Sequence, residues 1–201
     1  MPQVLIVDYG AGNLLSLKFA LEKTGLKAKI SVPTEKLKET NAIVLPGVGN
    51  FTAAAKALDS VKQELVDTIK AGTPVLGICL GMQLYFESSE EGPGAGLGFF
   101  AGKNIYLKGS VKVPHMGWNT IAKIRDNELF EGVSDGAYVY FVHSLYPVPE
   151  DKRIVCTQTE YSKTFVSAVA DKNIYGTQFH PEKSGEIGLR ILKNFAKTVT
   201  R

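Results

Sequence analysis

Cys79 is the residue whose neighbours best prepare it to act as a nucleophile. It lies in Gly77-Ile78-Cys79-Leu80-Gly81, directly after the apolar run Val75–Ile78 and before Met82–Ser88, which we expect to be helical. Glycines on both sides permit a strained turn that exposes the thiol, and the N-terminus of the following helix favours a thiolate and offers backbone N–H groups to an oxyanion. The pattern predicts a nucleophile elbow with cysteine in place of serine. The alternative is a buried structural cysteine beside a glycine-rich turn.

A cysteine nucleophile needs a base, because an unperturbed thiol is only about a few per cent thiolate at neutral pH. His180 ends the strand-like run Ile174–Phe179, and Glu182 follows two residues later. Alternate residues of an extended segment face the same side, and Pro181 restricts the backbone between them. The carboxylate can then hold the tautomer and charge of the imidazole. These residues predict a Cys-His-Glu triad, whereas without Cys79 the histidine and glutamate would indicate only a solvated turn.

Two glycine-rich segments invite further hypotheses. Pro46-Gly47-Val48-Gly49 follows the apolar run Ala42–Leu45, and its glycines allow backbone N–H groups to approach a ligand and to complete an oxyanion hole with the Leu80 N–H. A plain glycine turn is the alternative. Gly10-Ala11-Gly12 resembles a dinucleotide-binding loop, but Leu15 stands where that fingerprint has glycine and no acidic residue ends the second strand. We therefore expect no nucleotide cofactor.

The elements that must position these residues alternate between strand and helix through the first half of the chain. Strands are expected at 4–7, 28–32, 42–45 and 75–78, helices at 14–23 and 35–40, and a long helix before Gly72 with Leu58, Val61, Leu65 and Ile69 on one face. This alternation predicts an α/β fold with a largely parallel sheet. The second half, with strand-like runs at 138–142, 154–159 and 165–170, predicts mixed or antiparallel additions, and 186–199 predicts a final amphipathic helix.

Length and composition limit the class of protein. The 201 residues, taken as one domain over 1–201, carry a formal net charge of +3 with 44% hydrophobic and 21% charged residues. We expect no nucleic-acid-binding arm and no membrane span, and the start of the chain lacks a signal-peptide pattern, which favours the cytoplasm. Two cysteines exclude a disulfide framework and a four-cysteine zinc site. The second, Cys156, lies among threonines without a base nearby and is expected to be dispensable.

The motifs taken together resemble the class I, triad-type glutamine amidotransferases, most closely the glutaminase subunits of imidazole glycerol phosphate synthase in histidine biosynthesis. The cysteine elbow and His180-Pro181-Glu182 are typical of the superfamily. The more specific resemblance rests on the following segments: Asp8-Tyr9-Gly10-Ala11-Gly12-Asn13, Pro46-Gly47-Val48-Gly49, Gly81-Met82-Gln83, Pro114-His115-Met116-Gly117-Trp118-Asn119, Tyr140-Phe141-Val142-His143-Ser144 and Gln178-Phe179-His180-Pro181-Glu182-Lys183-Ser184. It implies a three-layer, flavodoxin-like fold whose mixed sheet has a parallel centre.

The resemblance also implies roles for individual residues. It makes Cys79 the nucleophile, His180 the base and then the acid, Glu182 its orienter, and Val48 with Leu80 the oxyanion donors. Contacts to glutamine are implied for Gly47, Gly49, Gln83, His143 and Ser144. For His143 the alternative is a strand-end histidine satisfied by neighbouring backbone. The family usually has tyrosine after the His-Ser pair, whereas here Leu145 precedes Tyr146, so no role is assigned to that tyrosine.

The implied reaction is hydrolysis of glutamine through a cysteine thioester, without a metal or cofactor. Ammonia in neutral water is mostly protonated and therefore not nucleophilic, so the product is useful only if a partner receives it unexposed. The resemblance implies that this partner is the (β/α)₈ cyclase subunit, which makes imidazole glycerol phosphate and an aminoimidazole carboxamide ribonucleotide. Met116, Trp118, Asn119 and Lys183 match segments at or near the interface. The alternative for Trp118 is a core aromatic beside a glycine turn.

Three other functions remain as alternatives. The chain could be a class I glutaminase that serves anthranilate, pyridoxal phosphate, guanylate or carbamoyl phosphate synthesis, although the segment 114–119 argues against this. It could be a non-catalytic α/β binding module, which the intact set of Cys79, His180 and Glu182 disfavours. A free-standing cysteine hydrolase is the third alternative. It predicts turnover without a partner, whereas the synthase subunit should be nearly idle alone.

Overall fold

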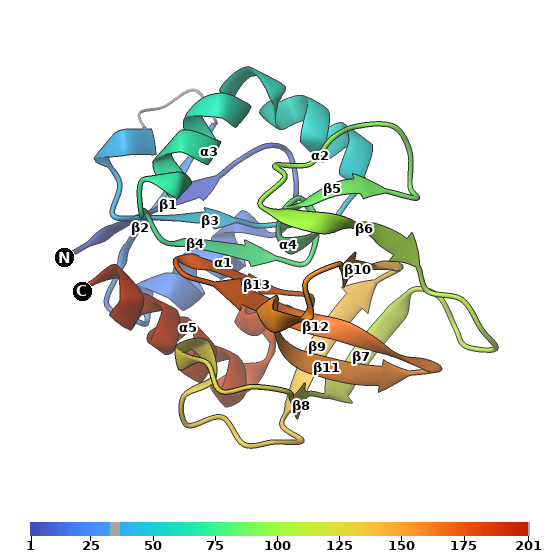
Figure 1. Cartoon of the computed structure of the whole chain (residues 1–201). Helices are drawn as coiled ribbons and strands as arrows, with labels where there is room; N and C mark the ends of the chain where they lie inside the picture. The colour runs from blue at the N-terminus through green and yellow to red at the C-terminus, as the bar shows by residue number, and fades with distance from the viewer. Residues whose placement is uncertain (33–36, 201) are drawn as a thin grey trace.

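A central sheet organises the computed structural model, which describes residues 1–32 and 37–200 (Figure 1). Within this described part the sheet has eight strands in the order β2-β1-β3-β4-β13-β12-β11-β8. The strands are β1 (Gln3–Val7), β2 (Lys27–Ser31), β3 (Ala42–Leu45), β4 (Val75–Ile78), β8 (Ala122–Lys123), β11 (Val155–Tyr161), β12 (Lys163–Asp171) and β13 (Ile174–Thr177). From β2 to β13 neighbouring strands are parallel, and β12, β11 and β8 continue the sheet antiparallel. The predicted α/β class and mixed sheet with a parallel centre are confirmed.

Helices cover both faces of this sheet and give the predicted three layers. Figure 1 shows α2 and α3 above the sheet and α1 and α5 below it. One apolar core contains Leu17 of α1 and Leu192 of α5, and the other contains Phe51 of α2 and Leu65 of α3. The helices are α1 (Leu14–Glu22), α2 (Phe51–Leu58), α3 (Lys62–Lys70), α4 (Leu80–Gln83) and α5 (Gly185–Val199), with 3₁₀ turns η1 (Leu37–Glu39), η2 (Asp59–Val61), η3 (Glu128–Phe130), η4 (Lys152–Ile154) and η5 (Pro181–Lys183). None of the helices in the described ranges is long and apolar enough to cross a membrane.

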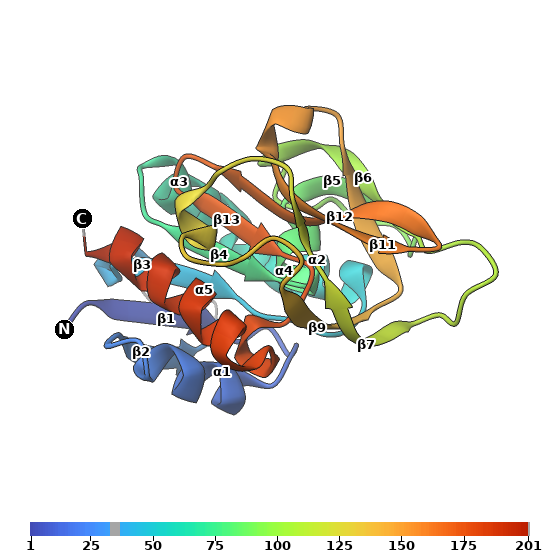
Figure 2. The same cartoon turned by 90° about the horizontal axis from the view of Figure 1, so that it is seen from below.

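Two smaller sheets lie at the carboxyl ends of the parallel strands. One pairs β10 (Leu145–Pro149), β6 (Phe100–Tyr106) and β5 (Phe86–Ser89), and the other pairs β7 (His115–Thr120) with β9 (Tyr138–His143). Both Figure 1 and Figure 2 show them at the end of the molecule toward which β1, β3, β4 and β13 run. This end of an open parallel sheet is where ligands bind in α/β folds.

The local apolar patterns explain most elements. β3 and β4 are buried along their whole length, as expected for strands covered on both faces. Asn13 and Asn50 accept hydrogen bonds from Ser16 N and Ala53 N and so cap α1 and α2. The predicted strands at 138–142, 154–159 and 165–170 correspond to β9, β11 and β12, and the predicted last helix corresponds to α5.

Three expectations about helices need correction. Met82–Ser88 is not a helix, because α4 ends at Gln83 and β5 begins at Phe86, where pairing with β6 and burial of the Phe86 ring against Phe100 override the local pattern. The predicted long helix is two helices joined by η2, whose Asp59-Ser60-Val61 sequence has weak helix propensity. The helix expected at 35–40 is a 3₁₀ turn at Leu37–Glu39, and positions 35 and 36 lie outside the described residues.

Candidate active site

The turn between β4 and α4 places Cys79 in a strained backbone conformation. Its φ of 53° and ψ of −104° are unusual for a residue with a side chain. The flanking glycines make the turn possible by close backbone approach. A Cβ on Gly81 would lie 1.9 Å from the Leu45 carbonyl oxygen, and one on Gly77 would lie 2.7 Å from the Gly81 backbone. The predicted strained turn is therefore present, but it does not expose the thiol as expected, because Cys79 is only 4% exposed.

Parallel pairing of β13 with β4 carries the histidine segment to the same edge of the sheet. Thr177 pairs with Ile78, and Cys79 N donates a hydrogen bond of 2.7 Å to the Thr177 carbonyl oxygen. Beyond β13 the chain enters η5, where His180 Nδ1 donates to Glu182 Oε1 at 2.8 Å. The two side chains are 3% and 5% exposed. The structure thus brings together the three residues predicted as a triad.

His180 is held as a cation by its two neighbours. Burial alone would lower the pKa of its imidazole, but the interactions with Cys79 and with Glu182 outweigh this effect and raise the pKa to about 10. His180 Nε2 is buried and makes no hydrogen bond with any residue of the described part. Because Nδ1 is bonded to Glu182, Nε2 is the nitrogen available for proton exchange with the thiol. At neutral pH this arrangement favours an imidazolium beside the Cys79 sulfur.

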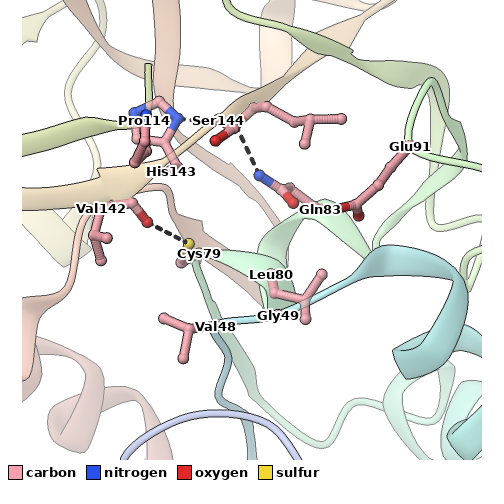
Figure 3. Close-up of a pocket in the computed structure, with 11 residues that line it drawn as sticks. Val48, Gly49, Cys79, Leu80, Gln83, Glu91, Pro114, Val142, His143 and Ser144 are labelled. Carbon is pink, nitrogen blue, oxygen red and sulfur yellow. Dashed lines mark hydrogen bonds between the residues drawn. The ribbon is translucent and has the colours of Figure 1, made fainter. Parts of the chain in front are cut away.

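A cavity of about 200 Å³ opens beside the Cys79 sulfur (Figure 3). Several residues predicted to contact an oxyanion or substrate line it, and Glu91, Pro114, Val142 and Leu145 join them. The predicted lining residues are Val48, Gly49, Cys79, Leu80, Gln83, His143 and Ser144. Gly47, a further predicted contact, is not among the lining residues. The cavity is enclosed by the ends of β3 and β4, by α4, and by the turn between β9 and β10.

The segment 46–49 presents a carbonyl oxygen where an oxyanion donor was predicted. The Gly47 carbonyl oxygen accepts from Leu80 N at 3.4 Å. In a planar trans peptide the C=O and the following N–H point in opposite directions, so the Val48 N–H points away from the Leu80 N–H. The two predicted donors do not converge in this conformation. The Tyr9 hydroxyl donates to the Pro46 carbonyl oxygen and fixes the beginning of the segment.

The loop Asp8–Asn13 packs against this segment. A Cβ on Gly12 would lie 3.3 Å from both the Cα and the N of Gly47, so glycine is needed for the two loops to pack together. Burial, with a smaller effect of Cys79, raises the pKa of Tyr9, which therefore stays a neutral hydrogen-bond donor. Sequence analysis singled out this loop without identifying its supporting contact.

His143 lines the cavity, but both of its ring nitrogens are bonded within the chain. Nδ1 lies 2.9 Å from the Leu145 carbonyl oxygen, which makes it the protonated nitrogen, and Nε2 lies 3.1 Å from His115 Nδ1. His115 Nε2 in turn lies 3.4 Å from Asn119 Nδ2. Burial lowers the pKa of His143 to about 3 and that of His115 to about 4, so both rings are neutral. Both ring nitrogens are thus engaged, one of them with backbone as the alternative reading expected, and a contact between His143 and glutamine stays a prediction.

Glu91 is a lining residue that sequence analysis missed. Its carboxylate Oε2 accepts from Phe51 N at 2.5 Å at the beginning of α2, and the side chain borders the cavity across from Cys79 (Figure 3). It is the acidic member of the lining. The sequence Glu90-Glu91-Gly92 looks like an ordinary polar turn, and only tertiary packing distinguishes the second glutamate from the first.

The residues expected at a partner interface differ in their surroundings. Met116 and Trp118 project from β7 with 62% and 55% exposure, so Trp118 is not a core aromatic. Lys183 is exposed, with Nζ 5.8 Å from the centroid of the Tyr140 ring, which Trp118 also contacts. Asn119 is engaged within the chain, because its Nδ2 donates to the Glu160 carbonyl oxygen at 3.0 Å.

Comparisons with known proteins agree over nearly the whole chain. The family model for class-I glutamine amidotransferases matches residues 5–199. The imidazole glycerol phosphate synthase subunit HisH of Pyrococcus furiosus is 48% identical over 98% of this chain and 100% of the relative. HisH of Bacillus cereus is 45% identical over 98% of this chain and 95% of the relative.

Among solved structures, PurLQS from Thermotoga maritima has a TM-score of 0.80 at 18% identity, covering 98% of each chain. A glutamine amidotransferase from Thermotoga maritima has a TM-score of 0.67 at 19% identity, covering 98% of this chain and 83% of the other. The two structural likenesses concern the fold alone.

Proposed function

The chain belongs to the class-I glutamine amidotransferases, in the family of the imidazole glycerol phosphate synthase subunit HisH, and we propose that it is the glutaminase subunit of such a synthase. It hydrolyses glutamine to glutamate and ammonia for histidine biosynthesis. The observation that carries the proposal is the strained Cys79 beside the His180–Glu182 pair at the wall of a small cavity.

The reaction begins when the Cys79 thiolate attacks the side-chain amide carbon of glutamine and forms a tetrahedral intermediate. The His180 imidazolium gives its Nε2 proton to the departing nitrogen, the C–N bond breaks, and ammonia and a thioester result. Neutral His180 then takes a proton from water, which attacks the thioester. Collapse of the second intermediate releases glutamate and regenerates the thiolate and the imidazolium, while Glu182 keeps the ring oriented throughout.

Negative charge develops on the amide oxygen in both steps and needs backbone donors. The Leu80 N–H lies at the beginning of α4, beside the nucleophile, and is one donor. The Val48 N–H becomes the second donor when the peptide between Gly47 and Val48 turns over, which also frees the Leu80 N–H from the Gly47 carbonyl. The unrotated peptide therefore corresponds to a resting state with little glutaminase activity.

The lining of the cavity suits the end of glutamine that carries the α-ammonium group. The Glu91 carboxylate attracts the α-ammonium group, and Gly49, Ser144 and Gln83 offer polar atoms around the substrate. The Gln83 side-chain nitrogen is already committed to the Leu145 carbonyl oxygen and to Gln178, so its oxygen is the atom available to the substrate. His143 contributes the shape of its ring rather than a hydrogen bond.

The ammonia passes to the (β/α)₈ cyclase subunit, the second component of the synthase. Exposed apolar side chains on the small sheet β7–β9 support a docking surface at this end of the molecule. They are Met116, Trp118 and Tyr138, and Lys183 lies next to them on the Tyr140 ring. Large exposed aromatic residues of this kind are typical of protein interfaces.

Glutamate release from glutamine by the purified chain, with and without a purified cyclase subunit and its nucleotide ligand, tests this function. We expect little turnover by the chain alone and strong stimulation by the liganded partner. Turnover that is high alone and unaffected by the cyclase would indicate a free-standing hydrolase. The absence of turnover under every condition, in a protein that binds the cyclase, would indicate a non-catalytic subunit.

A further inference from the structure

Gln178 contacts the sulfur of the nucleophile directly. It follows β13 and lies beside Cys79, because Thr177 pairs with Ile78 in the parallel register. Its side-chain Nε2 is 3.4 Å from Cys79 Sγ, and the residue is 0% exposed. A fully buried amide in contact with a reactive thiol requires an explanation, since burial of an amide is favourable only when its hydrogen bonds are made.

The direction of this hydrogen bond follows from a chain of partners that begins at a backbone carbonyl. The Leu145 carbonyl oxygen can only accept, so the Gln83 atom 2.8 Å from it is the amide nitrogen. The same Gln83 nitrogen lies 3.1 Å from a side-chain atom of Gln178, which must then be the amide oxygen. The amide nitrogen of Gln178 is therefore the atom on Cys79, and it donates to the sulfur.

Two contacts on the Cys79 sulfur favour different protonation states. The Val142 carbonyl oxygen, 3.6 Å from Sγ, accepts from an S–H and favours the neutral thiol (Figure 3). A hydrogen bond donated to the sulfur is stronger when the sulfur is negatively charged, so Gln178 favours the thiolate. The charged and titratable groups that interact with Cys79 are His180, which Glu182 orients, and the neutral Tyr9. Gln178 provides a neutral donor that keeps acting after His180 has given its proton to ammonia.

We propose that Gln178 is a catalytic residue, whose amide donates to the Cys79 sulfur and stabilises the thiolate, and that Gln83 is the positioning residue that orients this amide. The inference deepens the proposed glutaminase function and rests on it. Hydrolysis requires the thiolate twice, as attacking group in the first step and as leaving group in the second. A donor that acts in both steps supports each of them.

Gln178→Met tests the proposal because methionine keeps the length and much of the volume of glutamine but cannot donate. The readout is the rate at which iodoacetamide alkylates Cys79, followed by mass spectrometry across pH in the whole chain without glutamine. Cys156 is an internal control for folding, because it is fully buried and stays protected while the fold is intact. Gln63→Met is the matched surface control, since Gln63 is exposed and donates a hydrogen bond to Asp67 on α3.

We expect Gln178→Met to slow alkylation of Cys79 about tenfold at pH 7, as loss of one hydrogen bond to a charged group implies. At high pH, where the thiol is ionised in both proteins, the variant should react at least as fast, since an unbonded thiolate is the better nucleophile. Gln83→Met should give a smaller slowing in the same direction, and Gln63→Met none. A pH profile for Gln178→Met that matches the parent, or a rate lowered equally at every pH, would overturn the proposal. Because no glutamine is used, this result is independent of whether the chain is a glutaminase.

Discussion

Two cysteines of one chain occupy opposite environments, and this separates the reactive thiol from the structural one. Cys79 lies at the strained elbow beside an imidazolium and a cavity. Cys156 lies on β11 with no exposure, its sulfur 3.7 Å from the Ile154 carbonyl oxygen, and burial, partly offset by Arg125, raises its pKa to about 11. The raised pKa of Cys156 makes it a poor nucleophile at neutral pH, which leaves Cys79 as the candidate.

We predict that Cys79→Ala abolishes glutamine hydrolysis and leaves the fold and partner binding unchanged, because alanine is slightly smaller and only the bond-forming atom is lost. Glutamate release in the assembled complex, with circular dichroism and a binding assay, measures this. Cys156→Ser should retain activity and is the control. More than trace activity in Cys79→Ala, or loss of activity in a folded Cys156→Ser, would mean that the wrong thiol has been identified.

Substitutions of His180 and of Glu182 should lower the glutaminase activity by different amounts. His180→Asn removes the proton donor and should be about as damaging as loss of the cysteine, whereas Glu182→Gln keeps a hydrogen-bonding group at the 2.8 Å contact and should be roughly tens of times less damaging. The burst of thioester formed on mixing with glutamine measures the first step. Native burst kinetics in His180→Asn would show that another group is the base. The neutral, fully bonded His143 is a poor candidate for that role.

The pair His115 and His143 makes stability depend on pH. Burial holds their folded pKa values at about 4 and about 3, below the ordinary value of 6.5. Between pH 6.5 and these lower folded values, the unfolded chain binds more protons than the folded one. The free energy of unfolding therefore falls as the pH falls. We predict that each of the two rings contributes a loss of roughly 3 kcal/mol between pH 6.5 and pH 4. Titration of the ring resonances by NMR checks the cause, and titration of either ring near 6.5 would contradict it.

Among the structural elements, the segment 46–49 is the one that we propose controls the activity of the site. Its Gly47 carbonyl, rather than the Val48 N–H, meets Leu80 N. A Cβ on Gly47 would lie 2.7 Å from the Leu80 Cβ, so the tight packing depends on glycine. We propose that a turnover of the peptide between Gly47 and Val48 replaces this acceptor with a donor.

We predict that Val48→Pro, which has no N–H to offer, lowers partner-stimulated glutaminase activity by about a hundredfold to a thousandfold, toward the unstimulated level. Complex formation should persist. Val48→Ala keeps the N–H and is the matched control, and Gly47→Ala should impair activity through its contact with Leu80. Stimulated turnover that is unchanged in a correctly assembled Val48→Pro complex would place the second oxyanion donor elsewhere.

The same elements show how far sequence alone reaches. The elbow could be predicted because its glycines and apolar strand are adjacent in sequence, and the His180–Glu182 contact spans two positions. The strand within Met82–Ser88 could not be predicted, because it forms by pairing with the separate strand β6, where Phe86 pairs with Phe100. The contact between His143 and His115 was also beyond reach, since the two residues are 28 positions apart and meet only through the antiparallel register of β7 and β9. Glu91 and Gln178 join the site by tertiary packing in the same way.

At the scale of the whole molecule, the central sheet and the small sheet β7–β9 have different roles. The parallel centre brings Cys79 and His180 to one edge, and the small sheet β7–β9 extends from that edge and exposes Trp118 and Met116. Strand β9 joins the two regions, because Tyr140 contacts Trp118 and Lys183 while the far end of the strand reaches the cavity at His143. A site next to an exposed apolar surface suits an enzyme whose product passes directly to a partner.

The fate of the amide nitrogen tests the central claim most directly. Glutamine labelled with heavy nitrogen in its side-chain amide is given to the complex of this chain with a cyclase subunit and its nucleotide substrate, in an excess of unlabelled ammonium. We predict that the imidazole product carries the heavy nitrogen almost undiluted, and that the Cys79→Ala complex makes only unlabelled product from ammonium. Product from the parent complex that is diluted to the isotope ratio of the bulk ammonium would contradict the account, since the ammonia would then be released to solvent rather than handed to the partner.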